Sequence, residues 1–368
     1  MFLKSPKNNK RISVSLPNKR QEIFVGKDLS DWIIGELLAK EYSGFVIFCD
    51  TNFAKIYKNL LIEFKEKLKP VDVILVEPSE DSKSLNFLNS SLERCTEANF
   101  NRKGCFVALG GGIVGDIVGF LASVYMRGVD MVFVPTTLMA QGDTIINKVA
   151  ISHKLLKNVI GSFYSPGITV CDTNFLQSLS DKEISLGLSE IIKHALVYSK
   201  SFTSHLLKTL PLAMSDWKTY NWDEIVYKSL KTKGELVERD PYDELEIHKG
   251  LSYGHTFANV IEGLSQFNLR HGEAVALGMR MSGHISHEMR ILSKADFEIQ
   301  EMLLDAAGLP SKFPHPVEPD RIINYLKRDK ISTNGEISLV ILEKIGKHKV
   351  IRGVSEELVK ATLIKFQP

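Results

Sequence analysis

The sequence predicts an α/β fold in two domains, the first built on a parallel sheet and the second mostly α-helical. Three observations lead to this prediction. Short apolar runs alternate with helical patterns in the first half of the chain, as in parallel sheets that are covered on both faces. After about residue 178 the strand patterns fade and amphipathic helices follow. A length of 368 residues also exceeds what one small core usually organises.

The first domain is expected to span residues 1–177 and to be Rossmann-like. Helical patterns separate its strands, for example Leu85–Ala98 and the stretch that follows Gly112. Strand–helix alternation of this kind favours a parallel sheet. The expected strands are Phe45–Cys49, Val71–Val76, Cys105–Leu109, Met131–Val134 and Ile168–Cys171.

The second domain is expected to span residues 178–368. Ser180 with Glu183 resembles a capping box that opens the helix carrying GLSEIIKHALV. A β-like run at Ile337–Leu342 is the main exception to the helical texture. A crevice between two such domains is a usual place for a ligand.

Composition narrows the function. Lys and Arg total 46 against 44 Asp and Glu, a formal charge of +2, which gives no electrostatic footprint for nucleic acid. No apolar run reaches the length of a membrane span, and MFLKSPKNNKRISVSL lacks the apolar core of a signal peptide. The four cysteines form no CxxC pair, which predicts buried free thiols. We therefore expect a cytoplasmic protein that binds neither nucleic acid nor a membrane.

Two motifs follow expected strands. GGGIVGD, Gly110 to Asp116, combines a close backbone approach with a helix start, which suits a pyrophosphate. It departs from the usual GxGxxG pattern, and a tight strand–helix turn would need the same small residues. VPTTLMAQGDT places Thr136, Thr137 and Asp143 where ligands bind parallel sheets, although a Thr pair is more often a helix cap.

Three metal-type side chains stand at helical positions. Glu190 lies on one expected helix, and His255 and His271 each stand near the start of another. Two imidazoles and a carboxylate with one open position are typical of a catalytic zinc site. Glu190 with His194 at i,i+4 is a rival pair, and a single histidine is more often structural. The prediction depends on whether the three side chains meet in space.

Isolated cations stand beside turns and motif residues. A phosphorylated sugar would need several such groups, whereas a lysine is usually a solvated surface residue. The cations are Lys83, Arg127, Lys148, Lys157, Lys193, Lys233 and Lys330.

Taken together, eight segments resemble the 3-dehydroquinate synthase family of sugar-phosphate cyclases. Their number, order and length, over about residues 78 to 330, argue against a chance match. The resemblance implies a dinucleotide-binding N-terminal domain and a helical, metal-binding C-terminal domain. The segments are SEDSKSL, GGGIVGDIVGFLASVYMRG, VPTTLMAQGD, KNVIGSFYSP, GLSEIIKHALV, GHTFANVIEG, RHGEAVALGM and RDK.

The resemblance also implies site residues. Metal ligands would be Glu190, His255 and His271, and Arg127 would reach the phosphate of a neighbouring subunit in a homodimer. Contacts to NAD would come from Glu80, Lys83, Gly111, Gly112, Gly115, Asp116, Thr136, Thr137, Lys148, Lys157 and Ser178. The catalytic and substrate-site positions would be Lys193, Asp143, Lys148, Lys233, Asn158, Lys330, Arg127 and Asn259.

The implied reaction closes a heptulose(onate) 7-phosphate to a carbocycle. It combines NAD-assisted transient oxidation, elimination of phosphate and an intramolecular aldol step. A metal, Zn²⁺ or Co²⁺, would polarise the oxidised oxygen, and cations would stabilise the leaving phosphate. Because the cofactor is regenerated in each turnover, we expect a carbon–oxygen lyase acting on phosphates.

Several positions depart from the family pattern. Asn147-Lys148 replaces a glycine pair before the lysine, Ser252 an Asn, and Asn259 a His. Asn259 can donate a hydrogen bond to phosphate but cannot carry a proton. In the loop Asp240–Gly250 the Arg that would pair with a substrate carboxylate has no clear match, which removes a bidentate contact. These departures favour a sugar phosphate other than the substrate of 3-dehydroquinate synthase.

Four readings therefore stay open. The first is 3-dehydroquinate synthase itself, and the second is a sedoheptulose 7-phosphate cyclase or 2-deoxy-scyllo-inosose synthase. The third is a metal-dependent polyol dehydrogenase, which would release NADH. The fourth is a catalytically decayed homologue that only binds a sugar phosphate or a partner protein.

Overall fold

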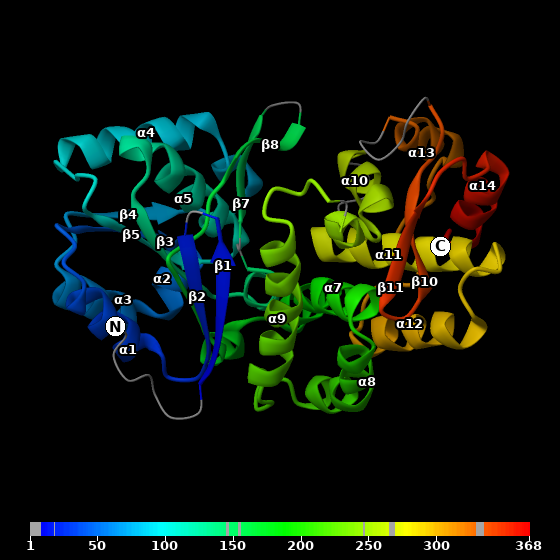
Figure 1. Ribbon diagram of the computed structural model, residues 1–368, viewed down its shortest axis with the longest axis horizontal. Coiled ribbons are helices and arrows are strands. Elements are labelled where there is room, and N and C mark those ends of the chain that lie inside the picture. Colours follow the sequence, from blue (N-terminus) through cyan, green and yellow to red (C-terminus); the bar gives the residue numbers. More distant parts are fainter. Residues whose placement is uncertain are drawn as a thin grey trace. The chain divides into compact units, whose positions relative to one another are not determined.

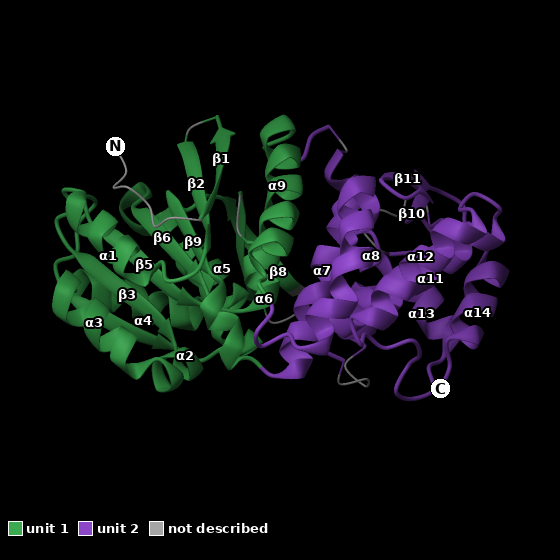
Figure 2. Ribbon diagram, turned by 90° about the horizontal axis from the view of Figure 1, so that it is seen from below, with its two compact units in different colours: residues 1–179, 221–242 green, residues 180–220, 243–368 purple. Residues whose placement is uncertain are grey.

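The computed structural model describes residues 9–17, 19–144, 147–153, 156–245, 247–264, 269–328 and 335–368. The chain forms two compact units, drawn in separate colours in Figure 2. Unit 1 contains residues 1–179 and 221–242, and unit 2 contains residues 180–220 and 243–368.

Unit 1 is built on a seven-stranded sheet with the order β1-β2-β9-β6-β5-β3-β4 (Figure 1). Neighbouring strands run parallel, except that β1 and β2 form an antiparallel hairpin. The five runs expected as strands are all present, which confirms the predicted parallel sheet. The strands are β1 (Lys10–Leu16), β2 (Lys19–Gly26), β3 (Phe45–Asp50), β4 (Asp72–Val76), β5 (Cys105–Gly110), β6 (Asp130–Pro135) and β9 (Ile168–Asp172).

Helices cover both faces of this sheet because successive strand residues point to opposite sides. In β3, Ile47 packs in one buried core with helices α1 and α3, whereas Phe48 packs in the other with α4 and α5. Strands buried on both faces explain the continuous apolar runs in the sequence. The helices of unit 1 are α1 (Ser30–Ala39), α2 (Thr51–Ile56), α3 (Lys58–Leu68), α4 (Leu85–Glu97), α5 (Gly112–Val124), α6 (Leu138–Gly142) and α9 (Asp223–Arg239).

Two antiparallel hairpins were not expected from the sequence. In β1, buried Ile12 and Val14 alternate with Arg11 and Ser13, a period-two pattern that would have revealed the strand. The second hairpin joins β7 (Lys148–His153) to β8 (Leu156–Phe163). Its strand β7 packs against α5 and so extends the core beside the glycine-rich turn.

Helices dominate unit 2, in agreement with the sequence. Helix α11 is buried along nearly its whole length and packs against α7, α10, α12, α14 and β10. The β-like run seen in the sequence falls on β10, which pairs with β11. The elements are α7 (Asp181–Tyr198), α8 (Lys200–Ser215), α10 (His255–Gly263), α11 (His271–Glu288), α12 (Lys294–Ala306), α13 (Pro319–Leu326), α14 (Glu356–Lys365), β10 (Leu339–Lys344) and β11 (Lys347–Ile351).

Helix α9 returns to unit 1 although it follows α8 in the chain. A Cβ atom at Gly234 would lie 3.1 Å from Cγ2 of Val14, so the helix packs closely on the β1–β2 hairpin. The hydroxyl of Thr173 donates to Asp223 at 2.6 Å. A single boundary at residue 177 therefore does not describe this division, which falls after Leu179 and interrupts unit 1. An amphipathic pattern shows that a helix has an apolar face but not what it covers.

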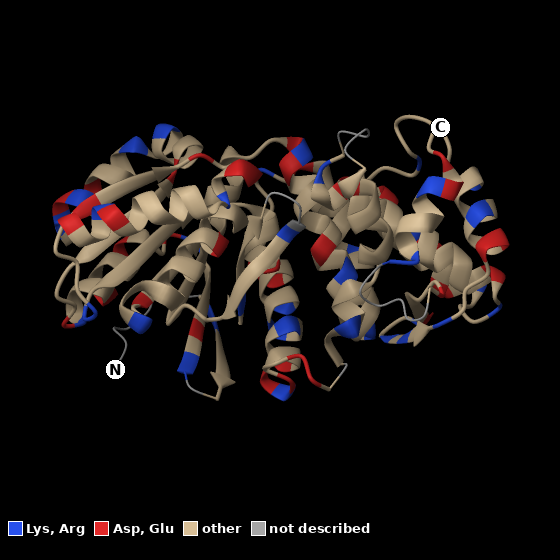
Figure 3. Ribbon diagram, turned by 90° about the horizontal axis from the view of Figure 1, so that it is seen from above, with Lys and Arg blue, Asp and Glu red and all other residues tan. Residues whose placement is uncertain are grey.

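Basic and acidic side chains are interspersed along the helices of both units (Figure 3). Among the residues that the structure describes, no helix combines the length and the apolar character needed to cross a bilayer. All four cysteines are buried and free, as the sequence predicted: Cys49, Cys95, Cys105 and Cys171.

Candidate functional site

Helix α7 carries Glu190 and Lys193 into the interior of unit 2. Its first residue follows Ser180, whose hydroxyl accepts a hydrogen bond from the N–H of Glu183 at 3.3 Å, the expected N-cap. The carboxylate of Glu183 pairs with Arg270 instead of closing the capping box. The helix is buried from Leu186 onwards through its next three turns, so Glu190 and Lys193 are charges held almost out of water.

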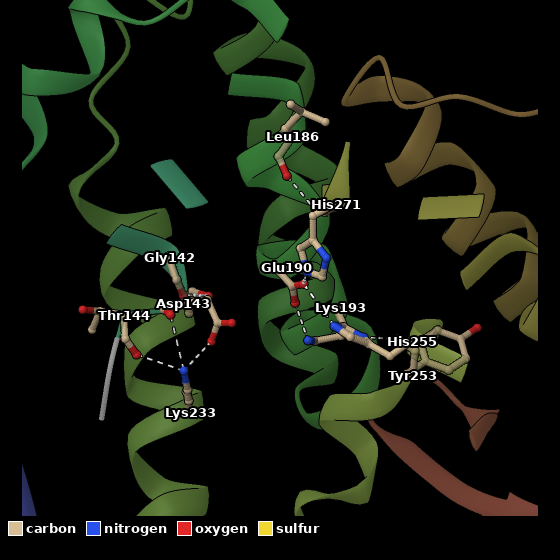
Figure 4. A network of polar contacts seen from close by, with 12 residues as sticks. Gly142, Asp143, Thr144, Leu186, Glu190, Lys193, Lys233, Tyr253, His255 and His271 are labelled. Atoms are coloured by element: carbon tan, nitrogen blue, oxygen red, sulfur yellow. Dashed lines mark hydrogen bonds and ion pairs between the residues drawn. The ribbon is translucent and has the colours of Figure 1, made fainter. Parts of the chain in front are cut away.

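The three metal-type residues of the sequence meet in space. His255 begins α10 and His271 begins α11, and both rings point at Glu190 (Figure 4). The Nε2 atoms lie 3.5 Å (His255) and 3.2 Å (His271) from the same oxygen, Oε1 of Glu190. One ligand atom from each residue lies within 4.8 Å of the other two. The spatial condition of the sequence prediction is therefore met.

The far side of each imidazole is held by an oxygen. Nδ1 of His271 lies 2.7 Å from Oε1 of Glu262, and Nδ1 of His255 lies 3.3 Å from the carbonyl oxygen of Tyr253. Metal-bound histidines almost always donate the second ring nitrogen to such an acceptor. The two Nε2 atoms and the carboxylate thus form a donor set that fits a divalent cation with an open position.

The charges of this cluster also suit a cation. Burial alone would raise the pKa of Glu190, but Lys193 and the two histidines lower that pKa well below its usual range. Burial and the charge of Lys193 lower the pKa of His255, which keeps this ring neutral. For His271, burial lowers the pKa, but Glu190 and Glu262 outweigh it and raise the pKa. An ionised carboxylate and neutral imidazoles are the forms that bind metal, so Glu190 and His255 already have the suitable form, whereas a cation must displace a proton from His271.

Lys193 contacts the other oxygen of Glu190, Oε2, rather than the one that faces the histidines. Its ammonium group therefore lies beside the candidate metal position without blocking the convergent atoms. His194 also offers a ring nitrogen within 4.8 Å of a Glu190 oxygen, so α7 carries the rival pair of the sequence as well.

In unit 1, the glycine-rich turn joins β5 to α5. A Cβ atom at Gly110 would lie 2.6 Å from Cγ2 of Val114, so only glycine permits this close turn. Gly111 is the N-cap residue of α5, and Gly115 is buried inside the helix. A Cβ atom at Gly112 would meet no atom within 4 Å, which leaves space beside the exposed N–H groups of the helix start. Such a start suits a pyrophosphate.

Lys83 links two other segments of unit 1. Its Nζ lies 2.8 Å from Oδ2 of Asp116 on α5 and donates to Oδ1 of Asn158 on β8. Burial raises the pKa of Asp116 even though Lys83 acts in the opposite direction. Glu80 accepts a hydrogen bond from Ser152 at 2.7 Å. Asn158, expected with the substrate group, thus lies with residues expected to contact the cofactor.

The segment after β6 carries the two threonines and Asp143. Thr136 is buried, and the hydroxyl of Thr137 caps α6 by accepting from the N–H of Ala140 at 3.2 Å. Nζ of Lys233 on α9 lies 2.6 Å from Oδ1 of Asp143 (Figure 4). The return of α9 to unit 1 therefore brings together two residues that are far apart in the chain.

The other residues expected to bind cofactor or substrate belong to several segments in both units. Lys148 begins β7 and Lys157 lies on β8, both exposed, and the hydroxyl of Ser178 donates to the carbonyl of Phe175 at 2.8 Å. Lys330 lies outside the described residues. Asn259 is exposed on α10, one turn after His255.

Arg127 lies in a turn with unusual backbone angles. Its φ is +63°, between Met126 at +50° and Gly128 at +118°. The left-handed region costs a non-glycine residue roughly 1–2 kcal/mol. Arg127 and Met126 are both exposed there. Strained, exposed backbone of this kind tends to mark functional segments.

Glu262 and Tyr253 were not expected from the sequence. Glu262 follows His255 by seven residues, which places it on the same face of α10. That spacing was the available signal for an acidic partner near the metal-type histidines. Tyr253 contributes a backbone carbonyl, for which side-chain chemistry gives no signal.

The chain thus combines an α/β unit that carries a glycine-rich turn with a helical unit that carries a candidate metal site. A sequence profile described as 3-dehydroquinate synthase N-terminal matches residues 73–186, and one described as 3-dehydroquinate synthase C-terminal matches residues 187–332. The chain belongs to the 3-dehydroquinate synthase family of sugar-phosphate cyclases.

Curated relatives cover nearly the whole chain. The 3-dehydroquinate synthase of Natranaerobius thermophilus is 32% identical over 94% of this chain and 95% of its own length. That of Clostridium kluyveri is 35% identical over 93% of this chain and 95% of its own length.

Solved structures share the fold at lower identity. A 2-deoxy-scyllo-inosose synthase complexed with carbaglucose-6-phosphate, NAD⁺ and Co²⁺ has a TM-score of 0.86 at 22% identity, covering 97% of this chain and 100% of that one. The 2-epi-5-epi-valiolone synthase of Streptomyces hygroscopicus with NAD⁺ and Zn²⁺ has a TM-score of 0.85 at 22% identity, covering 97% and 99%. Glycerol dehydrogenase from Schizosaccharomyces pombe reaches 0.66 at 14% identity, covering 100% and 92%.

Proposed function

We propose that this chain is an NAD- and metal-dependent sugar-phosphate cyclase in which Glu190, His255 and His271 bind Zn²⁺ or Co²⁺. The observation that carries the proposal is the convergence of both Nε2 atoms on one oxygen of Glu190. A bound metal would supply Lewis acidity at a substrate oxygen, and bound NAD would accept and return a hydride.

Unit 1 supplies the residues proposed to bind NAD. The open space beside Gly112 supports a pyrophosphate at the start of α5. The pair of Lys83 and Asp116, with Glu80 nearby in sequence, supports polar recognition of the rest of the dinucleotide. The other proposed contacts are Gly111, Gly115, Thr136, Thr137, Lys148, Lys157 and Ser178.

We propose 3-deoxy-arabino-heptulosonate 7-phosphate as the first substrate to test, because curated relatives at 32–35% identity are named 3-dehydroquinate synthases. The ammonium of Lys193 would bind a substrate oxygen beside the metal and hold it in place. Asn259 would donate a hydrogen bond to phosphate without carrying a proton. Further substrate contacts are proposed at Asp143, Lys148, Asn158, Lys233 and Lys330.

Arg127 is proposed to act across a homodimer. The strained turn exposes its guanidinium, whose planar fork suits bidentate binding of a phosphate. Sedimentation of the wild-type protein tests the dimer, and mixing Arg127→Ala with a second inactive variant tests the contribution across subunits. Recovery of activity in the mixed dimer would support the exchange.

Phosphate release tests the function. Purified enzyme with NAD and Zn²⁺ should be supplied in turn with 3-deoxy-arabino-heptulosonate 7-phosphate, sedoheptulose 7-phosphate and glucose 6-phosphate, with products identified by mass spectrometry. We expect phosphate and a carbocycle from the first substrate without net NADH. Release from one of the other two sugars would instead assign the related cyclase reaction.

Variants on α7 provide the matched comparison. Glu190→Ala should abolish metal binding and turnover, whereas Asp181→Ala removes an exposed carboxylate at the start of the same helix and should keep both. Full activity in Glu190→Ala would remove the proposed site. Net NADH from glycerol would support a polyol dehydrogenase, and normal binding of NAD and Zn²⁺ with no phosphate from any sugar would support a decayed homologue.

A further inference from the structure

Helix α11 touches two neighbouring segments backbone to backbone. A Cβ atom at Gly272 would lie 2.6 Å from the carbonyl oxygen of Leu186 on α7. A Cβ atom at Gly278 would overlap the carbonyl oxygen of Gly254 and lie 2.8 Å from its carbonyl carbon. Real side chains do not approach backbone this closely, so both contacts require glycine.

Each contact is adjacent to a candidate ligand. Gly272 follows His271, and Gly254 precedes His255. Leu186 lies one helical turn before Glu190 on the same face of α7. The two contacts therefore join the three backbone segments that carry the ligands, at points within about one turn of each ligand.

The atoms in these contacts leave little room for adjustment. A flexible side chain could rotate away from an added methyl group, but a helical carbonyl moves only with its helix. A shift of about 0.5 Å already matters for a functional constellation. An added Cβ atom would thus move a ligand rather than a neighbouring side chain.

Tyr253 adds a third constraint next to Gly254. Its side chain is fully buried, and its hydroxyl donates to Oε1 of Gln300 on α12. The same hydroxyl lies 3.2 Å from the carbonyl oxygen of Met279. The ring is therefore anchored at its far end, while its backbone carbonyl faces Nδ1 of His255.

We propose that Gly272, Gly278 and Tyr253 are positioning residues that set the spacing of Glu190, His255 and His271 around a divalent cation. This inference rests on the metal site of the proposed function. It extends that site to the packing of α11. The ligand geometry then depends on the close backbone contacts that Gly272 and Gly278 permit and on the buried hydroxyl of Tyr253.

Cobalt binding to metal-stripped protein tests the proposal without any turnover. The affinity is measured by competition with a chelator, and the ligand geometry by the visible absorption of bound Co²⁺. We expect Gly272→Ala and Gly278→Ala to weaken Co²⁺ binding about 10- to 100-fold, as loss of outer support does at other metal sites, and to change the spectrum. Tyr253→Phe, which removes one oxygen, should weaken binding by about tenfold.

Two controls separate positioning from general damage. Gly263→Ala, on α10, places a methyl group where no atom lies within 4 Å and should behave as wild type. Leu363→Ala, in the buried face of α14, should lower the melting temperature while keeping the Co²⁺ affinity and spectrum. An equal loss of Co²⁺ affinity in Leu363→Ala would overturn the proposal, because it would show a merely structural effect.

The remaining outcomes are distinct. If Gly278→Ala does not fold, Gly272→Ala and Tyr253→Phe decide. If the wild-type protein binds Co²⁺ and the folded variants bind it with the same affinity and spectrum, the positioning inference is overturned and the metal site of the proposed function stands. Wild-type protein that binds no Co²⁺, or a Glu190→Ala variant that binds it normally, overturns the metal site and this inference with it.

Discussion

Glu262 and Glu190 face opposite sides of the His271 ring. Oε1 of Glu262 lies 2.7 Å from Nδ1, and Oε1 of Glu190 lies 3.2 Å from Nε2. Glu262 can accept only if Nδ1 carries a proton, so in the neutral ring Nε2 has the lone pair that a metal would bind. Glu262 thereby selects the tautomer and orientation of a ring whose side chain is otherwise 42% exposed.

Replacement of this carboxylate should therefore weaken metal binding. We expect Glu262→Gln to lower Zn²⁺ affinity roughly 10- to 100-fold, because the amide can rotate and offers a weaker acceptor than a carboxylate. Chelator competition measures the change. Glu288→Gln, at the exposed end of α11, is the control. An unchanged affinity in Glu262→Gln would show that the ring is oriented without it.

Lys83 should matter for NAD more than for the metal. The variant Lys83→Met removes a cation that lies 2.8 Å from Asp116 and that is proposed to contact NAD. A charge-assisted hydrogen bond typically contributes about 1.5–3 kcal/mol. We expect NAD affinity to fall by about tenfold or more in a fluorescence titration, with Zn²⁺ affinity unchanged. Lys67→Met, which removes an exposed lysine on α3, is the control.

The double variant Lys83→Met/Asp116→Asn separates two causes. It removes the buried carboxylate that the single variant leaves without its cation. Recovery of thermal stability, with an NAD affinity below that of the single variant Asp116→Asn, would assign Lys83 to the ligand. Recovery of both would assign the first loss to the unpaired charge of Asp116.

Asn259 should affect phosphate departure. A histidine at this exposed position, one turn after His255, could donate a proton that an amide cannot supply. We expect Asn259→His to change the rate of phosphate elimination more than the affinity for NAD, as measured by rapid quench and by cofactor titration. Equal elimination rates in the two proteins would show that this departure from the family pattern is neutral.

The four thiols should resist modification at mildly alkaline pH. Burial raises the pKa of Cys49, Cys95 and Cys105 from 9.0 to about 12, and burial also raises the pKa of Cys171. Because the thiolate is the reactive form, a pKa near 12 lowers its fraction at pH 8 by about 10³-fold. We expect a disulfide reagent to label these thiols rapidly only after denaturation. Fast labelling of the folded protein at pH 8 would contradict the buried positions.

The sheet could be predicted because its strands are covered on both faces. Runs such as Cys105–Leu109 are continuously apolar, and such runs stand out in any sequence. Strand β1 instead alternates Ile12 and Val14 with Arg11 and Ser13, a period-two signal that a search for continuous apolar runs does not find. The place of α9 could not be predicted, because its partner Val14 lies near the other end of unit 1.

The candidate ligands could be named from the sequence, but their meeting could not. Glu190, His255 and His271 begin or occupy three different helices, and their convergence depends on how those helices pack. That packing requires glycine at positions 272 and 278, where the lack of a side chain lets the helices approach closely. A missing side chain gives no chemical signal in a sequence. Glu262 was overlooked because a lone acidic residue near the end of a helix is common on surfaces.

The return of α9 to unit 1 has a consequence for synthesis. The last strand of the sheet, β9, leaves the ribosome well before Asp223–Arg239 emerge. Until then, Val14 on the hairpin of β1 and β2 stays exposed to solvent, because α9 is not yet there to cover it. A gene fragment that stops at Leu179 would keep that apolar strip exposed and would tend to aggregate. Expression of the sheet on its own therefore requires the distant helix to be fused back onto it.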